Sequence, residues 1–374
     1  GCILQDLFDD GWDVDYGFNP YNHTGKFGSL ELSGRRFPSI TGTPAQRLTE
    51  LTQRLKDLGW AGCGLWTACQ CPGESWSHHE PAAKRVEDLK KKLGWCGEAG
   101  VSYLKVDWGA HDGSVEYRAM MSELRDEYCP GTMIEHALTW GVPLNGCGVE
   151  QKDGRQTLKI GTARCLGDAG FESRIGKKVW TLLKSSDVFR IYDLSSPIFY
   201  PTAIERAFLL LETAEQVGAS TIINVEDVLY LAASLGCSAG IMRAPVWAEP
   251  ERDVTNRHKS CGEATRLVAW QRIAPAFGAR ADFRTRHTDL TLTDSWTFKP
   301  CDAWYKPLHG RTVPQTAPAI VTRGLVRFPE VKDEGEGVPF LAAMRHPNGA
   351  LAVGALPRID DAKGYRVPAA DGYV

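Results

Sequence analysis

The chain has 374 residues, of which 43% are hydrophobic and 24% charged, an ordinary globular composition that can bury a sizeable core. Its net charge of −3 at pH 7 excludes a surface built to follow nucleic-acid phosphates, so we expect no nucleic-acid partner. No run of eighteen or more uncharged apolar residues occurs, which excludes a membrane-spanning helix. This length favours one large domain with a smaller companion.

Residues 1–8 have the pattern of a strand, and the predicted strand includes the first numbered residues. They lack the basic start and the small-residue cleavage site of a signal peptide. We therefore expect the numbered chain to begin inside a larger protein. The compartment stays open, with a secreted or periplasmic location among the options, and so does the oligomeric state.

The next elements alternate between helical and strand patterns. Thr43-Pro44 supplies an N-cap and a first-turn proline, and leucines then recur at helical spacing up to Leu58, before Gly59 ends the helix. A short apolar strand follows at residues 61–66. Further helices are predicted around residues 86–93, 117–124 and 204–211, and further strands at 101–106, 132–134, 188–191 and 221–225.

This alternation is typical of parallel βα units, so we predict a (β/α)8 TIM-type barrel over residues 1–284. Residues 141–178 are glycine-rich and polar without a firm period, and we interpret them as a long loop after a barrel strand. A smaller antiparallel β domain is predicted at residues 285–374, since His346-Pro347-Asn348-Gly349 separates two short strands and Asn-Gly favours a hairpin.

Acidic residues follow three predicted strands, where a barrel enzyme carries its catalytic groups. The first cluster, Asp9-Asp10-Gly11-Trp12, offers carboxylates for sugar hydroxyls and an indole for the face of a sugar ring. In the second, strand alternation puts Lys105 and Asp107 on the same side, opposite to Leu104 and Val106, and Trp108 follows. A lysine there favours the ionised form that a nucleophile requires.

The third acidic residue, Asp193, ends a strand that contains Arg190. Glycoside hydrolysis needs two carboxyl groups, a nucleophile and a proton donor, which need not be close in sequence. Each of the three clusters has a structural alternative, namely a capping turn, a buried Lys–Asp pair or an Arg–Asp pair. Additional substrate-binding candidates at strand ends are Trp66, Trp108, Glu135 and Trp140, while Asn224 to Asp227 either binds substrate or caps a helix.

The eleven cysteines form no pairing framework, and we interpret most of them as small buried hydrophobes. Cys69-Gln70-Cys71 with His78 and His79 lacks the ligand spacing of structural zinc sites. We therefore expect no metal site, and the chemistry of the acidic clusters requires no cofactor.

In order, these motifs resemble the α-galactosidase clan of glycoside hydrolases, particularly its melibiase-type members. The matching segments are Asp9 to Trp12, Arg36-Phe37-Pro38 followed by Leu58 to Trp66, Tyr103 to Asp107, Asn224 to Leu229, and Glu263 to Trp270 with Ala274-Pro275.

The resemblance implies a retaining α-glycosidase that acts on terminal α-galactosides, with Asp107 as nucleophile and Asp193 as acid/base. It also implies sugar contacts by Asp9, Asp10, Trp66, Lys105 and Arg190, and an oligosaccharide or glycoconjugate as substrate. Related activities remain open: α-N-acetylgalactosaminidase, β-L-arabinopyranosidase, a transglycosidase, or a carbohydrate-binding barrel without catalysis.

Overall fold

The computed structural model describes residues 5–14, 27–71, 74, 82–137, 147–152, 155–160, 177–191, 200–225, 229–240, 263–278, 286–297, 312–322, 324–325 and 339–356. The chain divides into two compact units. The N-terminal unit comprises residues 3–142 and 177–189, and the second unit comprises residues 1–2, 143–176 and 190–374. The predicted domain boundary between residues 284 and 285 falls inside the second unit and stays a prediction.

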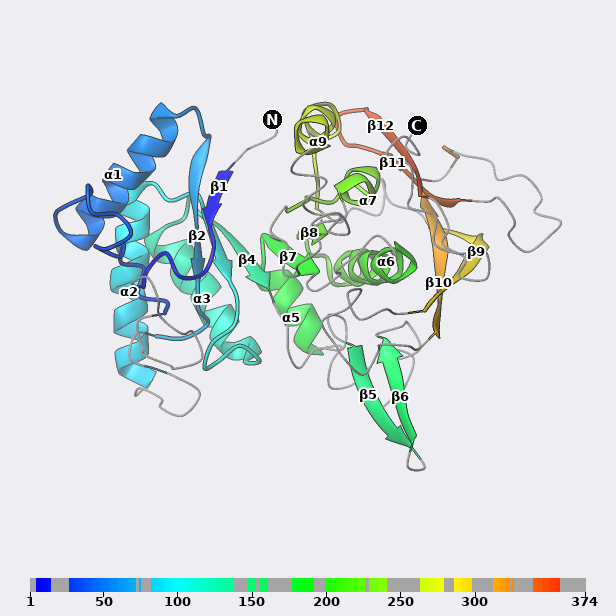
Figure 1. The fold of residues 1–374 in the computed structure, drawn as a ribbon, viewed down its shortest axis with the longest axis horizontal. Coiled ribbons are helices and arrows are strands. Elements are labelled where there is room, and N and C mark those ends of the chain that lie inside the picture. Colours follow the sequence, from blue (N-terminus) through cyan, green and yellow to red (C-terminus); the bar gives the residue numbers. More distant parts are fainter. Residues whose placement is uncertain are drawn as a thin grey trace. The chain divides into compact units, whose positions relative to one another are not determined.

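Parallel strands separated by helices form the N-terminal unit, as predicted (Figure 1). Strands β1, β2, β3 and β4 pair in parallel and in chain order. The elements are β1 (Gln5–Phe8), α1 (Pro44–Asp57), β2 (Gly62–Thr67), α2 (Ala82–Ala99), β3 (Tyr103–Val106), α3 (Val115–Tyr128), β4 (Met133–Ala137), α5 (Lys177–Ser185) and the first half of β7 (Val188–Ile191). The chain is therefore α/β.

Helix α1 shows how local sequence sets these elements. Thr43 caps the helix in an extended conformation, and its hydroxyl and the Gln46 side chain form a reciprocal capping box. Three of the predicted leucines are buried, but Leu58 is 76% exposed. Leu58 is exposed because the helix ends at Asp57 and Leu58 is the C-cap residue.

The strands β2, β3 and β4 present two different faces. Leu65, Leu104 and Ile134 are register partners, all fully buried, and they pack with apolar side chains of α1, α2 and α3. Trp66, Lys105 and Glu135 are the next register partners and therefore point to the opposite face. That second face carries the candidate site residues Trp66, Lys105 and Glu135.

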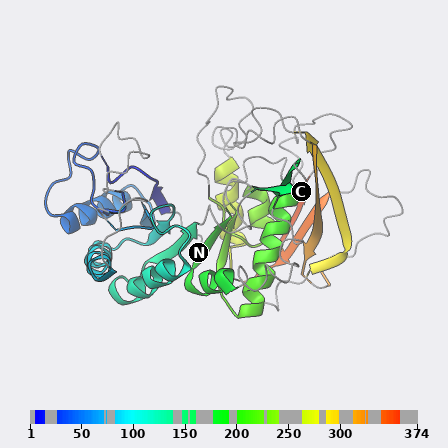
Figure 2. The ribbon, with the colours of Figure 1, turned by 90° about the horizontal axis from the view of Figure 1, so that it is seen from below.

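The second unit contains β5 (Cys147–Lys152), β6 (Arg155–Ile160), the second half of β7, α6 (Tyr200–Val217), β8 (Ile222–Val225), α7 (Leu229–Ser234), α9 (Glu263–Ile273), β9 (Arg286–Thr297), β10 (Thr312–Val321), β11 (Phe340–Arg345) and β12 (Leu351–Leu356). Helix α6 packs on β10 (Figure 2). Within the N-terminal unit the parallel sheet has the order β1-β2-β3-β4. Closure into an eight-stranded barrel stays a prediction.

Two expectations for the second unit need correction. Residues 141–178 contain the antiparallel pair β5–β6 rather than loop alone. Hydrophobic periodicity did not predict these two strands, because polar residues occupy successive positions in both of them. Asp153-Gly154 between the strands is nevertheless a sequence that favours a hairpin turn. The late strands form the sheet β12-β11-β10-β9, in which β10 and β11 pair in parallel, so the predicted purely antiparallel arrangement is wrong. The β11–β12 hairpin itself is confirmed.

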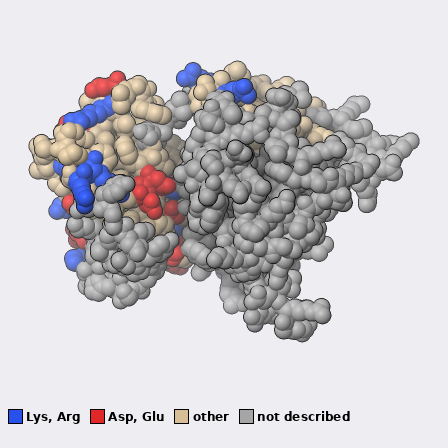
Figure 3. All heavy atoms as spheres, viewed as in Figure 1, with Lys and Arg blue, Asp and Glu red and all other residues tan. Residues whose placement is uncertain are grey.

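Surface charge and hydropathy agree with the composition. On the described part of the N-terminal unit, Figure 3 shows basic and acidic side chains in small separate groups. Among the described residues, no helix is both long and apolar enough to cross a bilayer.

Candidate active site

The acidic cluster after β1 meets the acid at the end of β3, as the parallel register requires. The Lys105 ammonium lies 3.0 Å from Asp9 Oδ1 and 3.6 Å from Asp107 Oδ2. Lys105 is fully buried and Asp107 is 2% exposed, whereas the Asp9 side chain is 40% exposed. The predicted same-side placement of Lys105 and Asp107 is confirmed, and one buried cation bridges two carboxylates.

Asp107 is held on one side of its carboxyl group only. Oδ2 accepts a 3.1 Å hydrogen bond from the indole nitrogen of Trp66 and faces Lys105. Oδ1 is buried and has no hydrogen-bond partner within the part of the chain that the structure describes. An unsatisfied buried oxygen is costly and needs an explanation, and a catalytic role is one such explanation.

Burial is the largest influence on the Asp107 carboxyl and raises its pKa above the ordinary 3.8, while Lys105 and the Trp66 hydrogen bond oppose this. The pKa of Asp10 is also raised, first by burial and then by Asp9, and a hydrogen bond with the Trp108 side chain lowers it. The site therefore gathers several acids around one lysine, a setting in which neighbouring carboxyls differ in proton affinity.

Three aromatic rings pack beside Asp107. The Trp66 and Trp108 ring centroids are 5.1 Å apart, and Phe27 lies 5.9 Å from Trp66 and 4.9 Å from Trp108. Trp66 is fully buried, and its backbone carbonyl accepts a 2.8 Å bond from Trp12, which is itself buried. These are structural contacts, so the sugar-binding roles of Trp12, Trp66 and Trp108 stay predictions.

Glu135 faces the same side of the sheet from β4. It is fully buried, and its Oε2 accepts a 2.7 Å hydrogen bond from the Tyr103 hydroxyl on the neighbouring strand. His136, the next residue, points the other way, and burial lowers its pKa well below 6.5. The structure thus separates these two neighbours, and the proposed substrate contact of Glu135 stays a prediction.

The remaining predicted site residues are not placed with Asp107. Asp193 and Trp140 lie outside the described residues. Arg190 belongs to the second unit, where it is 3% exposed and where its guanidinium and the Asn224 amide both lie 3.4 Å from the position that a Cβ on Gly240 would take. Gly240 thus leaves room for these two polar groups to converge, and their roles stay predictions.

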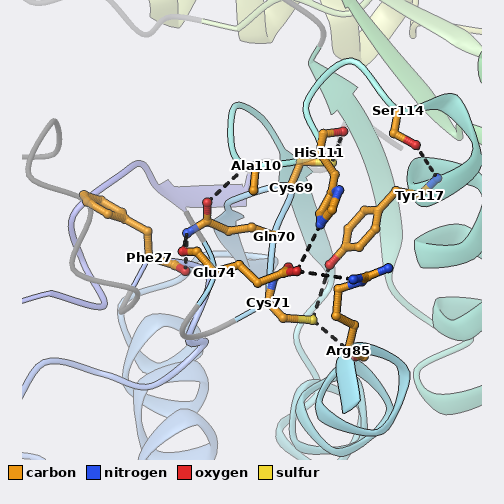
Figure 4. Close-up of polar contacts among 10 residues, drawn as sticks. All are labelled: Phe27, Cys69, Gln70, Cys71, Glu74, Arg85, Ala110, His111, Ser114 and Tyr117. Atoms are coloured by element: carbon orange, nitrogen blue, oxygen red, sulfur yellow. Dashed lines mark hydrogen bonds and ion pairs between the residues drawn. The ribbon is translucent and has the colours of Figure 1, made fainter. Parts of the chain in front are cut away.

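The loops that follow β2 and β3 are bonded to each other (Figure 4). The Cys69 amide donates to the Trp108 carbonyl and the His111 amide donates to the Cys69 carbonyl, both at 2.9 Å. Gly109 has φ +153°, and a Cβ there would lie 2.8 Å from the Cys69 backbone, so only glycine allows this approach. The Gln70 side chain adds a bond from the Ala110 amide.

Glu74 lies at the centre of the hydrogen-bonded loops after β2 and β3, which together are called the brace. Sequence patterns did not predict its role. It is fully buried, and Figure 4 shows it between His111 and Arg85. One oxygen lies 3.1 Å from His111 Nε2 and 3.6 Å from Arg85 Nη1, and the other accepts a 2.7 Å bond from the Cys71 amide. Glu74 therefore fixes the loop that follows Trp66.

Glu74→Gln should lower the free energy of unfolding by about 2 kcal/mol, because the amide loses the ion pairs while the neighbouring donors stay buried. Urea unfolding of the variant and the wild type measures the difference. The matched control is Glu50→Gln, which removes an exposed (i, i+4) pair with Arg54 and should cost about 0.5 kcal/mol or less. Equal losses in both variants would contradict the bracing role of Glu74.

The cysteines near this brace are not reactive groups. Six cysteines are free and buried, as expected for most of the eleven: Cys63, Cys69, Cys71, Cys96, Cys129 and Cys237. Burial raises the pKa of Cys69 to about 11 and that of Cys71 to about 12, so neither thiol ionises near neutral pH. No group of three or more metal-ligating side chains occurs in the described ranges, and His78 and His79 lie outside them.

Asp13, just past the first acidic cluster, is a second acid with an unusual environment. It is 5% exposed, its Oδ2 accepts a 3.0 Å bond from the Ser29 amide, and burial raises its pKa from 3.8 to about 6. A raised carboxyl pKa contributes stability at low pH that is lost as the pH rises through about 6.

Asp13→Asn should therefore stabilise the fold at pH 8, by an amount on the order of 3 kcal/mol, and have little effect below pH 4. Urea unfolding at the two pH values checks this expectation. A variant that shows the same stability difference from wild type at both pH values would refute the assignment of a raised pKa.

Comparisons with known proteins add no family assignment. No protein-family model matches the chain, and no curated protein matches it. Among solved structures, a GH27 β-L-arabinopyranosidase from Geobacillus stearothermophilus is similar at 9% identity and a TM-score of 0.42, over 63% of this chain and 62% of its own length. α-Galactosidase I from Mortierella vinacea is similar at 12% identity and a TM-score of 0.38, over 85% of each chain. Matches at this level establish neither the family nor the activity of this chain.

Proposed function

We propose that this chain is a retaining glycoside hydrolase in which Asp107 is the nucleophile and Asp193 the acid/base, acting on terminal α-galactosides. The observation that carries the proposal is the Asp107 carboxyl at the end of β3. One oxygen is held by Trp66 and Lys105, and the other is buried without a partner among the described residues. The sequence resemblance to the α-galactosidase clan supports the choice of substrate.

The chemistry assigns a task to each group. The Asp107 carboxylate attacks the anomeric carbon and forms a glycosyl ester, while Asp193 donates its proton to the departing oxygen. Asp193 then removes a proton from the water that cleaves the ester, which restores both groups and retains the anomeric configuration. In such an enzyme the two carboxyl groups are expected about 5–5.5 Å apart.

Lys105 and the Trp66 N–H stabilise the ionised form of Asp107, which is the reactive form. Asp9 and Asp10, at the end of β1, offer acceptors for paired sugar hydroxyls. This division of labour needs no metal ion or organic cofactor.

A panel of nitrophenyl glycosides tests the substrate class. We expect release of nitrophenol from the α-galactoside, with the α-anomer as the first sugar product by NMR. Faster release from an α-N-acetylgalactosaminide or a β-L-arabinopyranoside would reassign the sugar, and products extended by an added acceptor sugar would indicate a transglycosidase. Binding without turnover would refute the catalytic proposal.

Covalent trapping tests the mechanism separately. A galacto-configured cyclitol epoxide should be opened by the Asp107 carboxylate, which forms an ester to the ring carbon and leaves a hydroxyl at the other. Mass spectrometry of peptides should then locate the added mass on Asp107. Modification at a different carboxyl group would overturn the nucleophile assignment.

A further inference from the structure

Helix α3 carries a fully buried arginine, Arg118, whose guanidinium binds four backbone carbonyls. Its Nη2 donates to the carbonyls of Asp107 at 2.8 Å and Ala137 at 3.1 Å, and its Nη1 donates to that of Val106 at 2.9 Å. Its Nε donates to the Asp112 carbonyl at 2.9 Å. One side chain thus joins the ends of β3 and β4 and the loop after β3.

The positive charge of Arg118 has no carboxylate partner within ion-pair distance among the described residues. One titratable side chain in contact with it is His136, whose Nδ1 lies 3.4 Å from Arg118 Nη1. The pKa of His136 is lowered by burial and by the two arginines of α3, so the ring is neutral and does not repel Arg118. Because its Nδ1 faces a donor, Nε2 carries the hydrogen and donates to Ser122 Oγ at 2.9 Å.

A buried guanidinium is costly unless hydrogen bonds and nearby negative charge compensate the loss of water. The group it serves here is Asp107, whose main-chain carbonyl it binds and whose carboxyl pKa it lowers against the effect of burial. The other groups that act on this carboxyl are Lys105 on the same strand, Asp9 after β1, and the Trp66 indole on β2.

We propose that Arg118 is a positioning residue for the nucleophile, which fixes the main chain of Asp107 and adds a positive charge that favours its carboxylate. The inference rests on the proposed function of Asp107. Lys105 acts on the carboxylate through the side chain, and Arg118 acts from the main-chain side. Two cations on separate elements therefore favour the ionised form of one buried acid, against the effect of burial.

Replacing Arg118 by Gln and by Lys separates the two effects. Arg118→Gln removes the charge, so kcat should fall about tenfold or more and the acid limb of the kcat/KM profile should move to higher pH. Arg118→Lys keeps the charge but has fewer donors for four carbonyls, so kcat should fall while the acid limb stays near its wild-type position. KM should change little in both variants.

The matched control is Arg125→Gln, on the same helix. Arg125 is also buried, but it binds the Asp187 carboxylate and the Thr132 carbonyl near the start of β4, away from Asp107. This variant should lose stability and keep the wild-type acid limb. If Arg118→Gln behaves in the same way, with kcat and the acid limb unchanged in a folded protein, the proposal is overturned.

A readout without substrate separates this inference from the proposed function. The 13C resonance of the Asp107 carboxyl, assigned by its loss in Asp107→Asn, should titrate at higher pH in Arg118→Gln than in the wild type, and near the wild-type pH in Arg118→Lys. Identical titrations in all three proteins refute the role of Arg118. A shifted titration in a protein that hydrolyses no glycoside supports it and refutes the hydrolase proposal instead.

Discussion

Asp107→Asn is expected to lower kcat/KM for the hydrolysed glycoside by roughly 10⁴-fold or more, because a neutral amide cannot form the glycosyl ester. The substitution is nearly isosteric, and the Asn amide keeps an oxygen that can accept the hydrogen bond from Trp66. Circular dichroism should therefore show a folded protein. The measurement is steady-state kinetics on the substrate that the glycoside panel identifies.

The control for this result is Asp112→Asn, the same substitution in the loop after β3. The Asp112 carboxyl accepts a 2.7 Å bond from the Gly113 amide, which an Asn oxygen can also accept. Its activity should stay within about twofold of wild type. Wild-type activity in Asp107→Asn would exclude Asp107 as nucleophile, and an equal loss in both variants would indicate a general disturbance of the loop.

Asp107→Asn also has an expected effect on the free energy of unfolding. Because burial raises the pKa of Asp107, the folded chain holds this proton more tightly than the unfolded chain does. The contribution is therefore favourable at low pH and is lost as the pH rises through the folded pKa. Asp107→Asn should gain stability relative to wild type between pH 4 and pH 7, measurable by thermal unfolding, and a gain that shrinks over this range would contradict the sign.

Lys105→Met is expected to lower the free energy of unfolding by about 3 kcal/mol, since it leaves the buried Asp107 carboxylate without its cation. The Asp9 pair adds less, because the Asp9 side chain is 40% exposed and solvent screens it. Loss of the cation should also raise the pKa of Asp107 and move the acid limb of kcat/KM to higher pH. Urea unfolding at pH 7 and a pH–rate profile measure the two effects.

A double-mutant cycle isolates the Lys105–Asp107 interaction. In an Asp107→Asn background, Lys105→Met should cost less than in the wild type, because no carboxylate remains at position 107 to be left unpaired. The same cost in both backgrounds would show that Lys105 contributes through packing or through Asp9 alone. If Lys105→Met had the same free energy of unfolding as the wild type, the Lys105–Asp107 ion pair would make no net contribution to stability.

The helices and strands could be predicted where a local sequence pattern was sufficient to define them. Thr43-Pro44 and the leucine spacing located α1, and the apolar runs located β2, β3, β4 and β8. The β5–β6 hairpin was missed because polar residues occupy three successive positions next to the turn in each strand, which interrupts the apolar alternation. The parallel pairing of β10 with β11 was missed because pairing direction depends on contacts between distant segments.

The candidate site divides in the same way. Strand alternation predicted that Lys105 and Asp107 share a face, and a 3.6 Å separation confirms it. Glu74 gave no signal, since a single acid in a loop has no period. A sequence signal for Arg118 did exist. Arg118 lies three residues before Met121, which places it on the buried face of α3, where a charged residue is unexpected.

The sequence by itself determined which residues are acidic at the ends of strands and which side of β3 they face, because periodicity is local and alternation is fixed by backbone geometry. Only the tertiary structure decided that Asp9 and Asp107 share one lysine, that Trp66 donates to the carboxylate, and that Arg118 binds the carbonyl beneath it. The physical reason is that hydrogen bonds and ion pairs depend on distances of about 3 Å between groups far apart in sequence. Such distances exist only after the strands have paired and the helices have packed against them.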